Sequence, residues 1–488
     1  MEQAENGDAP TDTPVRVAVV GSGPAGVYTC EALLAWADEH GRDIVVDLVD
    51  SLPVPYGLLR HGVAPDHPRI KGIARVLRGI TDDPRIRFLG NVRFGHDLTL
   101  DDVRRHHHAV VLCTGALDDR ALGVPGEDLA GSHGAARFVT WYDGHPDAEP
   151  EWALDSERVA VVGVGNVALD VARMLVRPHE ELDATDIPEH VREGFGRNRT
   201  RVVSVIGRRG PAHARFTPLE LRELDGVGRV RVVVDPRDLE LTAAEQEVRA
   251  ADRHVDKVCT QLETWASAMA ERGESDPDAA EAAALDDGLR VVRFRFRRAP
   301  LEVLGEQGRV CGLRLAVTAT DDDGRVRPTE EVEELRVGAV YRAVGYRSAE
   351  VPGIPYDERS ATIPNDGGAV LTAPGGEPVP GVYTAGWVKR GPSGVIGTNR
   401  SCAVETVGRL TAALDAGELA DPAEPDPDAV PRELRERGVE VVDTAAWKAI
   451  DDAEIALGGG AGRERTKLAD REAMLAVVRA LETVAAAD

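Results

Sequence analysis

The chain has 488 residues, 42% of them hydrophobic, and a formal net charge of −26 at pH 7. This length exceeds one ordinary hydrophobic core, so two or three domains are expected. The negative charge argues against general nucleic-acid binding, which usually needs a basic surface. No apolar run reaches the 18 residues of a membrane span, and the N-terminus lacks the apolar stretch of a signal peptide. We therefore expect no membrane span and a cytoplasmic location.

The cysteines are scattered, with no C-x-x-C pair and no metal-ligand spacing. Each is expected to behave as a small buried hydrophobe. We therefore predict no metal site, no disulfide-exchange chemistry and no iron-sulfur cluster carried by the chain itself. The five positions are Cys30, Cys113, Cys259, Cys311 and Cys402.

The ordered part is expected to begin near Val15, after a polar, acidic tail over residues 1–13. An apolar strand, 17–20, then runs into a G-x-G-x-x-G turn whose glycines are Gly21, Gly23 and Gly26. Such a turn lets the backbone approach a pyrophosphate, whose charge is held by the following helix N-terminus. A second strand, 44–49, ends at Asp50, where a carboxylate accepts hydrogen bonds from a ribose. Because no basic residue adjoins this acid, the site favours FAD or NAD over NADP.

A stiff segment rich in proline and glycine follows, from Leu52 to Pro68. On the residues alone it is equally a connecting loop or a loop shaped for a function. A third apolar strand, 109–112, ends in a Thr-Gly turn, and we place a domain boundary near residue 117.

A second strand-turn-helix unit begins at residue 159, and its turn reads Gly163-Val164-Gly165-Asn166-Val167-Ala168. Ala168 takes the third glycine position, which the fingerprint permits. The next strand, 201–206, ends without an acid and carries Arg208 and Arg209 instead. Guanidinium groups bind a 2′-phosphate through charge-assisted hydrogen bonds, whereas a carboxylate would repel it. This unit is therefore predicted to bind NADP.

The rest of the chain gives weaker signals. Residues 239–287 are expected to form solvated helices without chemistry. Residues 291–298 alternate arginine with apolar residues, which predicts a solvent-exposed antiparallel strand or, less favoured, part of a dock for an acidic protein. The segment 337–344 is expected to return the chain to the first domain, whose last core strand ends at Gly386.

The run P-V-P-Y-G-L-L-R-H-G-V-A-P-D-H-P, from Pro53 to Pro68, resembles the adrenodoxin reductase family of ferredoxin-NADP reductases. Further blocks of the same pattern begin at Gly163, Ile206, Phe216 and Ala385, in family order. The resemblance implies an α/β fold of two Rossmann-like domains, as in glutathione reductase. A NADP-binding domain, 118–340, is inserted into a discontinuous FAD-binding domain, 14–117 and 341–488.

The resemblance also implies site residues. His67 and Glu223 are expected near the flavin-nicotinamide contact, where they would tune orientation and proton traffic. The residues implied to hold FAD are Gly21, Gly23, Pro24, Ala25, Gly26, Asp50, Gly57, Leu58, Val63, Trp387, Gly394, Val395 and Ile396. Those implied to hold NADP are Arg120, Gly165, Asn166, Val167, Ala168, Arg208, Arg209, Glu220 and Gly394.

NADPH gives two electrons as hydride while an iron-sulfur protein takes one at a time, and a flavin converts between the two regimes. The leading hypothesis is therefore an NADPH-dependent ferredoxin reductase whose partner could supply a cytochrome P450 or another oxidase. A flavin-dependent reductase or oxidase of small molecules such as quinones, and a non-catalytic nucleotide-binding module, remain alternatives. Candidate docking residues are Arg201, Arg215, Arg222 and the arginine strand. A monomer or weak dimer is expected.

Overall fold

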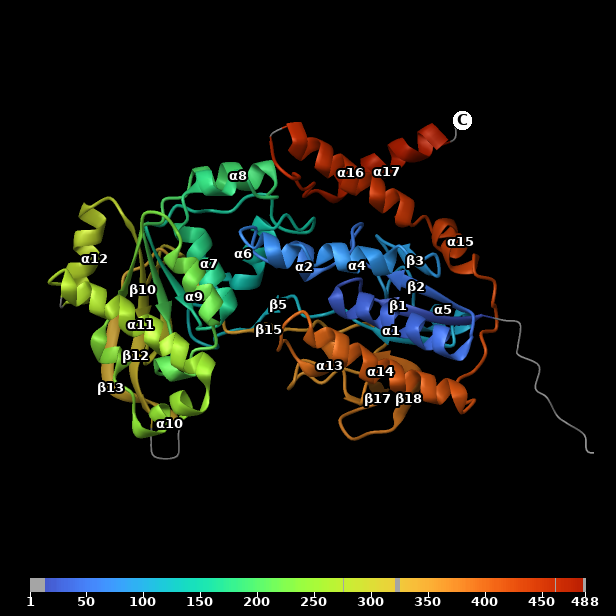
Figure 1. The fold of residues 1–488 in the computed structure, drawn as a ribbon, viewed down its shortest axis with the longest axis horizontal. Coiled ribbons are helices and arrows are strands. Elements are labelled where there is room, and N and C mark those ends of the chain that lie inside the picture. The colour runs from blue at the N-terminus through green and yellow to red at the C-terminus, as the bar shows by residue number, and fades with distance from the viewer. Residues whose placement is uncertain (1–13, 275, 321–324, 461, 486–488) are drawn as a thin grey trace, which may run out of the picture.

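The computed structural model describes residues 14–274, 276–320, 325–460 and 462–485, so the tail predicted over 1–13 lies outside the described residues. Two α/β domains lie side by side, and the C-terminal helices run along one side of the first domain toward the second (Figure 1). Four sheets organise the described chain: one of seven strands, one of six, one of three and one of two.

The first domain is built on the seven-stranded sheet, with order β16-β17-β18-β4-β1-β2-β3. Its parallel core places β1 between β2 and β4. The strands are β1 (Val15–Val20), β2 (Ile44–Val49), β3 (Ile86–Leu89), β4 (Ala109–Leu112), β16 (Asn365–Asp366), β17 (Ala369–Leu371) and β18 (Pro378–Thr384).

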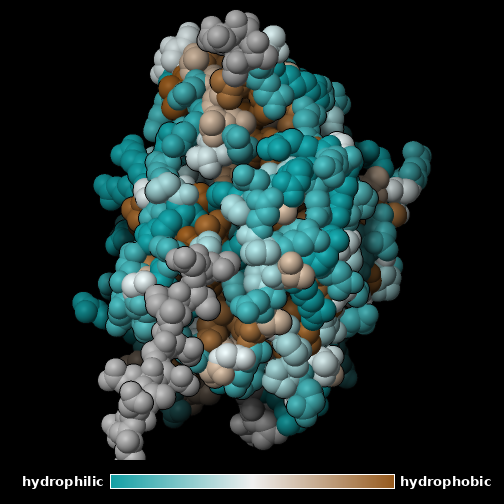
Figure 2. Space-filling model, turned by 90° about the vertical axis from the view of Figure 1, so that its right-hand side faces the viewer, coloured by the Kyte–Doolittle hydropathy of each residue, from teal (hydrophilic) through white to brown (hydrophobic). Residues whose placement is uncertain are grey.

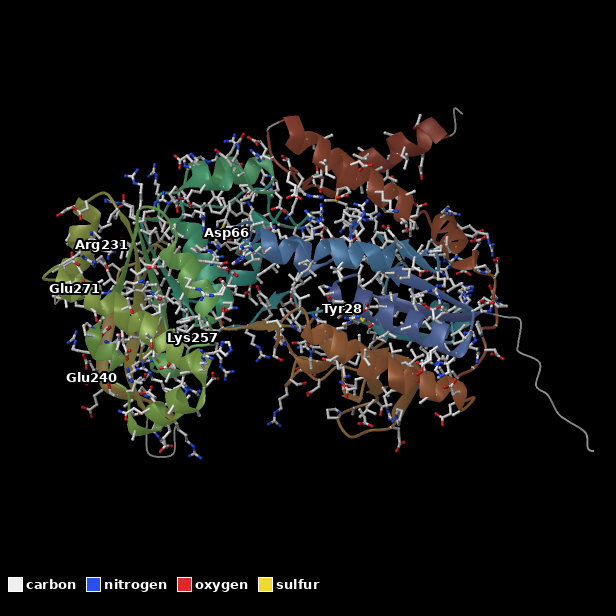
Figure 3. All side chains as sticks on the ribbon, in the orientation of Figure 1. Tyr28, Asp66, Arg231, Glu240, Lys257 and Glu271 are labelled. Atoms are coloured by element: carbon white, nitrogen blue, oxygen red, sulfur yellow. The ribbon has the colours of Figure 1, made fainter. Side chains whose placement is uncertain are left out.

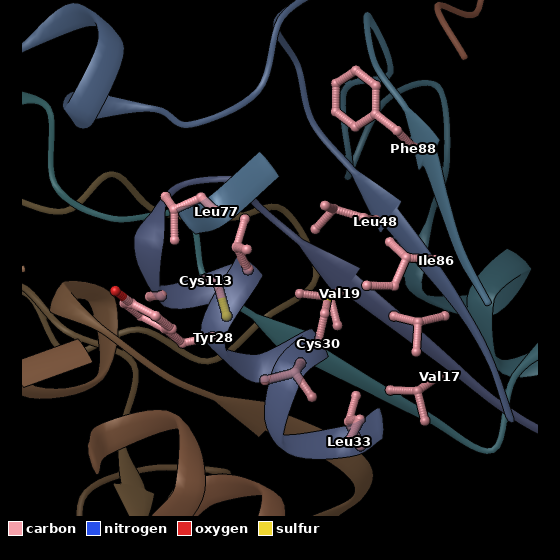
Figure 4. Packing of buried hydrophobic residues seen from close by; sticks show 14 of the residues in the cluster. Val17, Val19, Tyr28, Cys30, Leu33, Leu48, Leu77, Ile86, Phe88 and Cys113 are labelled. Carbon is pink, nitrogen blue, oxygen red and sulfur yellow. The ribbon is translucent and has the colours of Figure 1, made fainter. Parts of the chain in front are cut away.

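Alternation along β1 supplies both faces of this sheet. Val17 and Val19 belong to one apolar cluster, while Ala18 and Val20 belong to another on the opposite face. The first face is covered by α1 (Pro24–His40), which buries Cys30 and Leu33 against the strands (Figure 4). A strand buried on both faces reads as a continuous apolar run, which explains why β1 is predictable.

The second domain contains six parallel strands in the order β6-β14-β7-β8-β10-β9. They are β6 (Ser132–Gly134), β7 (Arg158–Val162), β8 (Val202–Ile206), β9 (Val230–Val234), β10 (Arg290–Arg295) and β14 (Ala339–Arg342). A three-stranded antiparallel sheet packs its apolar residues against this sheet. Its strands are β11 (Arg298–Glu306), β12 (Arg309–Thr320) and β13 (Val326–Leu335).

The remaining elements are mostly helices. Those of the first domain are α2 (Leu58–His61), α3 (Pro68–Lys71), α4 (Ala74–Thr81), α5 (Leu100–His106), α13 (Trp387–Arg390) and α14 (Thr398–Asp415). Those of the second are α6 (Ala135–Tyr142), α7 (Asn166–Val176), η1 (His179–Leu182), α8 (Glu189–Gly196), η2 (Pro211–His213), α9 (Pro218–Asp225), η3 (Pro236–Leu239), α10 (Ala243–Ala251), α11 (Arg253–Glu271) and α12 (Pro277–Asp286).

The prediction of an exposed antiparallel strand over 291–298 is wrong. β10 pairs in parallel with β8 and β9 inside the second sheet. Arg293 is buried and forms ion pairs with Asp278 and Glu281 of α12. Burial also lowers the pKa of Arg295 to about 10. Alternation indicated a shared arginine face but not the acidic helix that pairs with Arg293, so this side chain is not available to a partner protein.

The chain crosses between the domains twice, and the two crossings pair. β5 (Asp118–Asp119) leaves the first domain and forms an antiparallel pair with β15 (Tyr346–Arg347), which returns to it. Residues 337–344 were expected to return the chain to the first domain, but the return comes after them, because β14 still pairs with β7 and β6 in the second sheet. We propose that the second flavin-domain segment starts a few residues after the predicted position 341, beyond β14.

The C-terminal helices are α15 (Ala429–Glu436), α16 (Thr444–Gly460) and α17 (Arg471–Ala485). Trp447 and Met474 join the apolar core of the first domain. Lys467 is buried between Asp143 and Asp186 of the second domain, which also bind Lys71. This segment therefore ties the two domains together.

Most of the face in Figure 2 is hydrophilic, with apolar residues in smaller groups. Within the described residues, no helix combines the length and hydropathy needed to cross a membrane.

Candidate functional site

The first glycine turn joins β1 to α1. Gly21 has φ of 102°, and a Cβ there would lie 2.4 Å from the Cys113 carbonyl oxygen. A Cβ on Gly26 would lie 1.8 Å from the oxygen of Gly21. Pro24 and Ala25 open α1, whose N-cap, Gly23, provides no side-chain cap. The free amides of this helix start form a cradle for a phosphate, and the residues present fit a dinucleotide.

Asp50 follows β2 and reaches the same turn. Its Oδ2 accepts hydrogen bonds from the Ser22 amide (2.7 Å) and hydroxyl (2.5 Å), and its Oδ1 accepts one from the Leu52 amide (2.9 Å). Burial raises the pKa of this carboxyl, although these hydrogen bonds oppose the shift. A carboxylate offers about four lone-pair sites, so Asp50 both braces the turn and retains capacity for a ribose hydroxyl.

The stiff loop expected to serve a function packs onto this turn. The Tyr56 amide donates to the Ser22 carbonyl (3.0 Å), and a Cβ on Gly57 would lie 3.1 Å from Gly23 Cα. Leu58 begins α2, and Val63 packs against the first core. The loop therefore forms one wall of the cradle.

The segment after β18 approaches the same helix start. A Cβ on Gly386 would lie 2.5 Å from the Ala25 Cβ, which places Trp387 close to α1. The Trp387 ring lies 6.0 Å from that of Tyr346, and its Nε1 donates to the Ser393 carbonyl (3.2 Å). Gly394, Val395 and Ile396 follow in an irregular turn, and Val395 is 71% exposed. This turn presents backbone amides at the start of α14.

The second glycine turn has the same construction. A Cβ on Gly163 would lie 2.1 Å from the Ala343 oxygen, whereas nothing lies within 4 Å of one on Gly165. The turn therefore packs tightly against the Ala343 backbone at Gly163 and has open space beside Gly165. Asn166 begins α7, which has no side-chain cap, and accepts a hydrogen bond from the Thr217 amide (2.9 Å). Val167 is half-buried and Ala168 is buried in the helix.

Arg208 and Arg209 follow the neighbouring strand β8. Arg208 is exposed and Arg209 half-buried, and neither has a carboxylate within ion-pair distance among the described residues. Arg209 Nε is buried without a hydrogen-bond partner. The Arg208 carbonyl accepts from the Thr318 hydroxyl (2.7 Å), and the Arg209 carbonyl accepts from the Arg297 amide (3.2 Å). The turn is held by its backbone, which leaves both guanidinium groups available for an anion.

Arg120 lies on the double crossing. It is exposed, and its Nε donates to the Tyr346 carbonyl (3.1 Å). Its amide also donates to the Gly345 carbonyl (3.0 Å). The resemblance implies that Arg120 contacts a phosphate of NADP, and this contact stays a prediction.

His67 lies in a buried, charged cluster at the junction of the domains. The acids around it come from its own loop (Asp66, labelled in Figure 3), from α7 (Asp170) and from α9 (Glu220 and Glu223). His67 Nδ1 lies 3.0 Å from Glu223 Oε2, and Nε2 lies 3.1 Å from Asp170 Oδ1. The structure thus brings the two predicted residues, His67 and Glu223, together with Glu220.

The pKa values in this cluster reflect burial and opposing charges. Burial lowers the pKa of His67, but Asp170 raises it, and the net shift is upward. Burial and the charge of Asp170 raise the pKa of Glu220 to about 7. Burial would also raise the pKa of Asp66, but Arg173 outweighs it and lowers the value to about 2.

Sequence reasoning missed Asp66, Asp170 and Arg173 as site residues. Arg173 is fully buried and binds both acids. Polar residues at 170 and 173 within α7, and at 177 directly after its end, recur at helical spacing, which is a signal that the sequence already contains. His67, Asp170 and Glu220 could hold a metal ion by their spacing, but Arg173 already supplies a positive charge to both carboxylates.

The cysteines follow the sequence expectation with one exception. Cys30, Cys113, Cys259 and Cys402 are buried and free, while Cys311 is exposed. Burial raises the pKa of the Cys113 thiol to about 12, so it stays protonated.

Residues 15–196 match the family model for pyridine nucleotide-disulphide oxidoreductases. The chain is 40% identical to a probable ferredoxin/ferredoxin-NADP reductase of Mycobacterium tuberculosis, covering 95% of this chain and 75% of that protein. It is 39% identical to human mitochondrial NADPH:adrenodoxin oxidoreductase, covering 94% and 91% of the two chains. The structure of Mycobacterium tuberculosis FprA in complex with NADPH matches with a TM-score of 0.83 and 39% identity, over 95% of this chain and 99% of that one.

The chain therefore belongs to the family of ferredoxin-NADP and NADPH:adrenodoxin reductases. The predicted fold class and family are confirmed.

Proposed function

We propose that this chain is an FAD-dependent NADPH:ferredoxin reductase. The single observation that carries the nucleotide assignment is the end of β8, where Arg208 and Arg209 stand without acidic partners among the described residues. They lie beside the open turn at the start of α7, where the Gly163 amide donates to the Ile206 carbonyl (2.9 Å). A 2′-phosphate satisfies both arginines, and the helix start takes the pyrophosphate.

The residues of the first domain fit FAD. The uncapped start of α1 would hold its pyrophosphate, and Asp50 would accept from its ribose. Gly57, Leu58 and Val63 would line one wall, and Trp387 with Gly394, Val395 and Ile396 the other. When bound, the flavin supplies the exchange between two-electron and one-electron transfer. The protein's own residues bind and orient both nucleotides and exclude water from their meeting point.

Arg120, Asn166, Val167, Ala168, Glu220 and Gly394 are proposed to complete the NADP site. His67 and Glu223 are proposed to lie beside the reacting rings and to hold a proton between His67 Nδ1 and Glu223 Oε2, which are 3.0 Å apart. Both groups come from elements that meet only at the domain junction, so the assembled chain is needed to form this pair.

The nucleotide assignment is tested by replacing both arginines, Arg208→Ala and Arg209→Ala. The KM for NADPH should rise at least about 10- to 100-fold, because even one charge-assisted hydrogen bond contributes about 1.5–3 kcal/mol. The KM for NADH should change little. Equal losses with the two nucleotides would show that the arginines do not read the 2′-phosphate.

The acceptor is tested separately. Bleaching of a yellow preparation by NADPH would exclude a non-catalytic nucleotide-binding module. Reduction of a ferredoxin far faster than of a quinone would separate the proposed reductase from a flavin enzyme acting on small molecules. We propose that an acidic ferredoxin docks at Arg215 and Arg222, which are exposed and lack acidic partners among the described residues.

Ferredoxin reduction should then weaken as salt screens the charges. Arg222→Ala should lower the rate at low salt and flatten its salt dependence more than Arg201→Ala does. Arg201 serves as the matched control because its guanidinium donates to the Leu285 carbonyl (2.9 Å), away from α9. Salt-independent reduction would contradict this docking surface. The cytoplasmic location and the monomeric or weakly dimeric state remain predictions.

A further inference from the structure

Arg173 is the centre of the charged cluster at the domain junction. Its side chain is fully buried in α7. The guanidinium donates to Asp66 through Nε (2.6 Å) and Nη2 (3.0 Å), and to Glu220 through Nη1 (3.0 Å). Nη2 also lies 2.7 Å from Asp170 Oδ1 and 2.6 Å from His67 Nε2. These contacts tie a loop of the first domain to two helices of the second.

The guanidinium cannot move without breaking several contacts. Three carboxylates hold its fork from different sides, and their charges keep the pKa of Arg173 above its usual range in spite of burial. An arginine in proteins stays protonated and has no acceptor atom. Arg173 can therefore only donate, and the two hydrogens of its Nη2 are shared among Asp66 Oδ1, Asp170 Oδ1 and His67 Nε2.

This constraint decides the protonation of His67. A ring nitrogen 2.6 Å from a permanent donor must offer a lone pair, so Nε2 carries no proton while the contact exists. The ring proton of neutral His67 is then on Nδ1, which faces Glu223 at 3.0 Å. Asp170 Oδ1, 3.1 Å from Nε2, is the competing hydrogen-bond acceptor for a proton on Nε2, and Arg173 Nη2 already donates to this oxygen (2.7 Å).

We infer that Arg173 is a positioning residue that occupies the lone pair of His67 Nε2 and so fixes the ring proton on Nδ1, toward Glu223. All charged groups that face the ring enter this arrangement: Asp66, Asp170, Arg173, Glu220 and Glu223. The carboxylates favour a second proton on His67, and Arg173 opposes it. The consequence for catalysis rests on the proposed function, because it requires His67 to lie beside the reacting rings.

The chain offers a matched control at the C-terminal end of the same helix. Arg177 is one turn beyond Arg173 and also binds Asp66 (2.8 Å), together with Glu181 (2.7 Å). It has no contact with His67 among the hydrogen bonds and ion pairs of the described residues. Arg177→Lys therefore weakens a guanidinium-carboxylate pair of the cluster without altering the partner of Nε2.

The test is the nitrogen-15 NMR spectrum of the histidine rings in the FAD-loaded protein, titrated from pH 5.5 to 9, with His67→Gln used for assignment. Unmodified His67 should be protonated on Nδ1 alone at high pH. In Arg173→Lys, Nε2 should become protonated and bind Asp170, and the titration midpoint of His67 should rise by about one pH unit, the lower end of shifts caused by nearby charges. Arg177→Lys should match the unmodified protein.

The inflection in the pH profile of flavin reduction by NADPH should move in the same direction in Arg173→Lys. A double variant, Arg173→Met with Asp66→Asn, removes one charge of each sign and serves if the lysine variant fails to fold. A proton on Nε2 of the unmodified protein at high pH would overturn the inference, as would identical His67 titration in Arg173→Lys and Arg177→Lys. Because the NMR signal does not depend on turnover, a failure of the proposed function would appear separately, as flavin that NADPH does not reduce.

Discussion

The two glycine turns share a construction and differ in what surrounds them. Each closes on a carbonyl of a neighbouring strand end, Cys113 in the first and Ala343 in the second, and each opens an uncapped helix. The strand next to the first turn is followed by Asp50, and the strand next to the second turn is followed by Arg208 and Arg209. The turn therefore provides a phosphate site of one kind, and the neighbouring strand end selects the nucleotide.

The largest effect is expected at the third glycine position of the two turns, where the first turn has a glycine and the second has an alanine. Gly26 has the Gly21 oxygen 1.8 Å from the position of a Cβ, whereas its counterpart Ala168 already carries one. Gly26→Ala should displace α1 from its turn and reduce bound flavin at least about tenfold, since overpacking costs on the order of 1–3 kcal/mol. Flavin content of the purified protein, read from the ratio of 450 to 280 nm absorbance, measures it.

Ala168→Gly is the matched control at the second turn. It adds no atoms, so flavin content should remain normal and only a small loss of helix stability is expected. Normal flavin content in Gly26→Ala would show that the first turn tolerates a side chain as the second does, and the proposed difference in packing would be wrong.

The same comparison shows how far the sequence leads. The strand, the glycine turn and the residue after the next strand are local features, so β1, β2 and β8 with Asp50, Arg208 and Arg209 could be predicted. The partners of the buried Arg293 and Arg173 could not. Glu281 lies on the neighbouring helix α12, and Asp66 lies in a loop of the first domain. Pairing of buried charges depends on tertiary packing, which periodicity within one element does not encode.

The two following helices differ in charge. α1 buries apolar residues such as Cys30 and Leu33, whereas α7 carries Asp170 and Arg173 into the junction, where they meet Glu220. The pKa of Glu220 is raised from 4.5 to about 7 in the folded protein. Between pH 4.5 and about 7 the folded protein therefore keeps a proton on Glu220 that the unfolded chain has released. The contribution of this group to stability is therefore lost as pH rises through that window.

Glu220→Gln tests this pH-dependent contribution of Glu220 to stability. Near pH 5 the variant should melt close to the unmodified protein, because both carry a neutral side chain. At pH 8 the variant should be more stable by on the order of a few kcal/mol, since only the unmodified protein buries the extra charge. Differential scanning fluorimetry across this range measures the effect. A melting-temperature difference that is the same at both pH values would contradict the raised pKa.

The smallest effect is expected at Thr318, whose hydrogen bond supports the backbone that carries the two arginines. Thr318 is buried in β12 and donates its hydroxyl to the Arg208 carbonyl (2.7 Å), so the antiparallel sheet fixes the position of the arginines. In the described part of the chain, no such sheet supports the first turn. Thr318→Val keeps the shape but removes this hydrogen bond, worth about 0.5–1.5 kcal/mol. The KM for NADPH should rise about two- to tenfold with little change for NADH.

Thr329→Val is the matched control. It removes a similar hydroxyl-to-carbonyl bond in the same sheet (3.0 Å, to Val317) and should leave both KM values unchanged. If both variants behave alike, the sheet stabilises the domain without positioning the phosphate site.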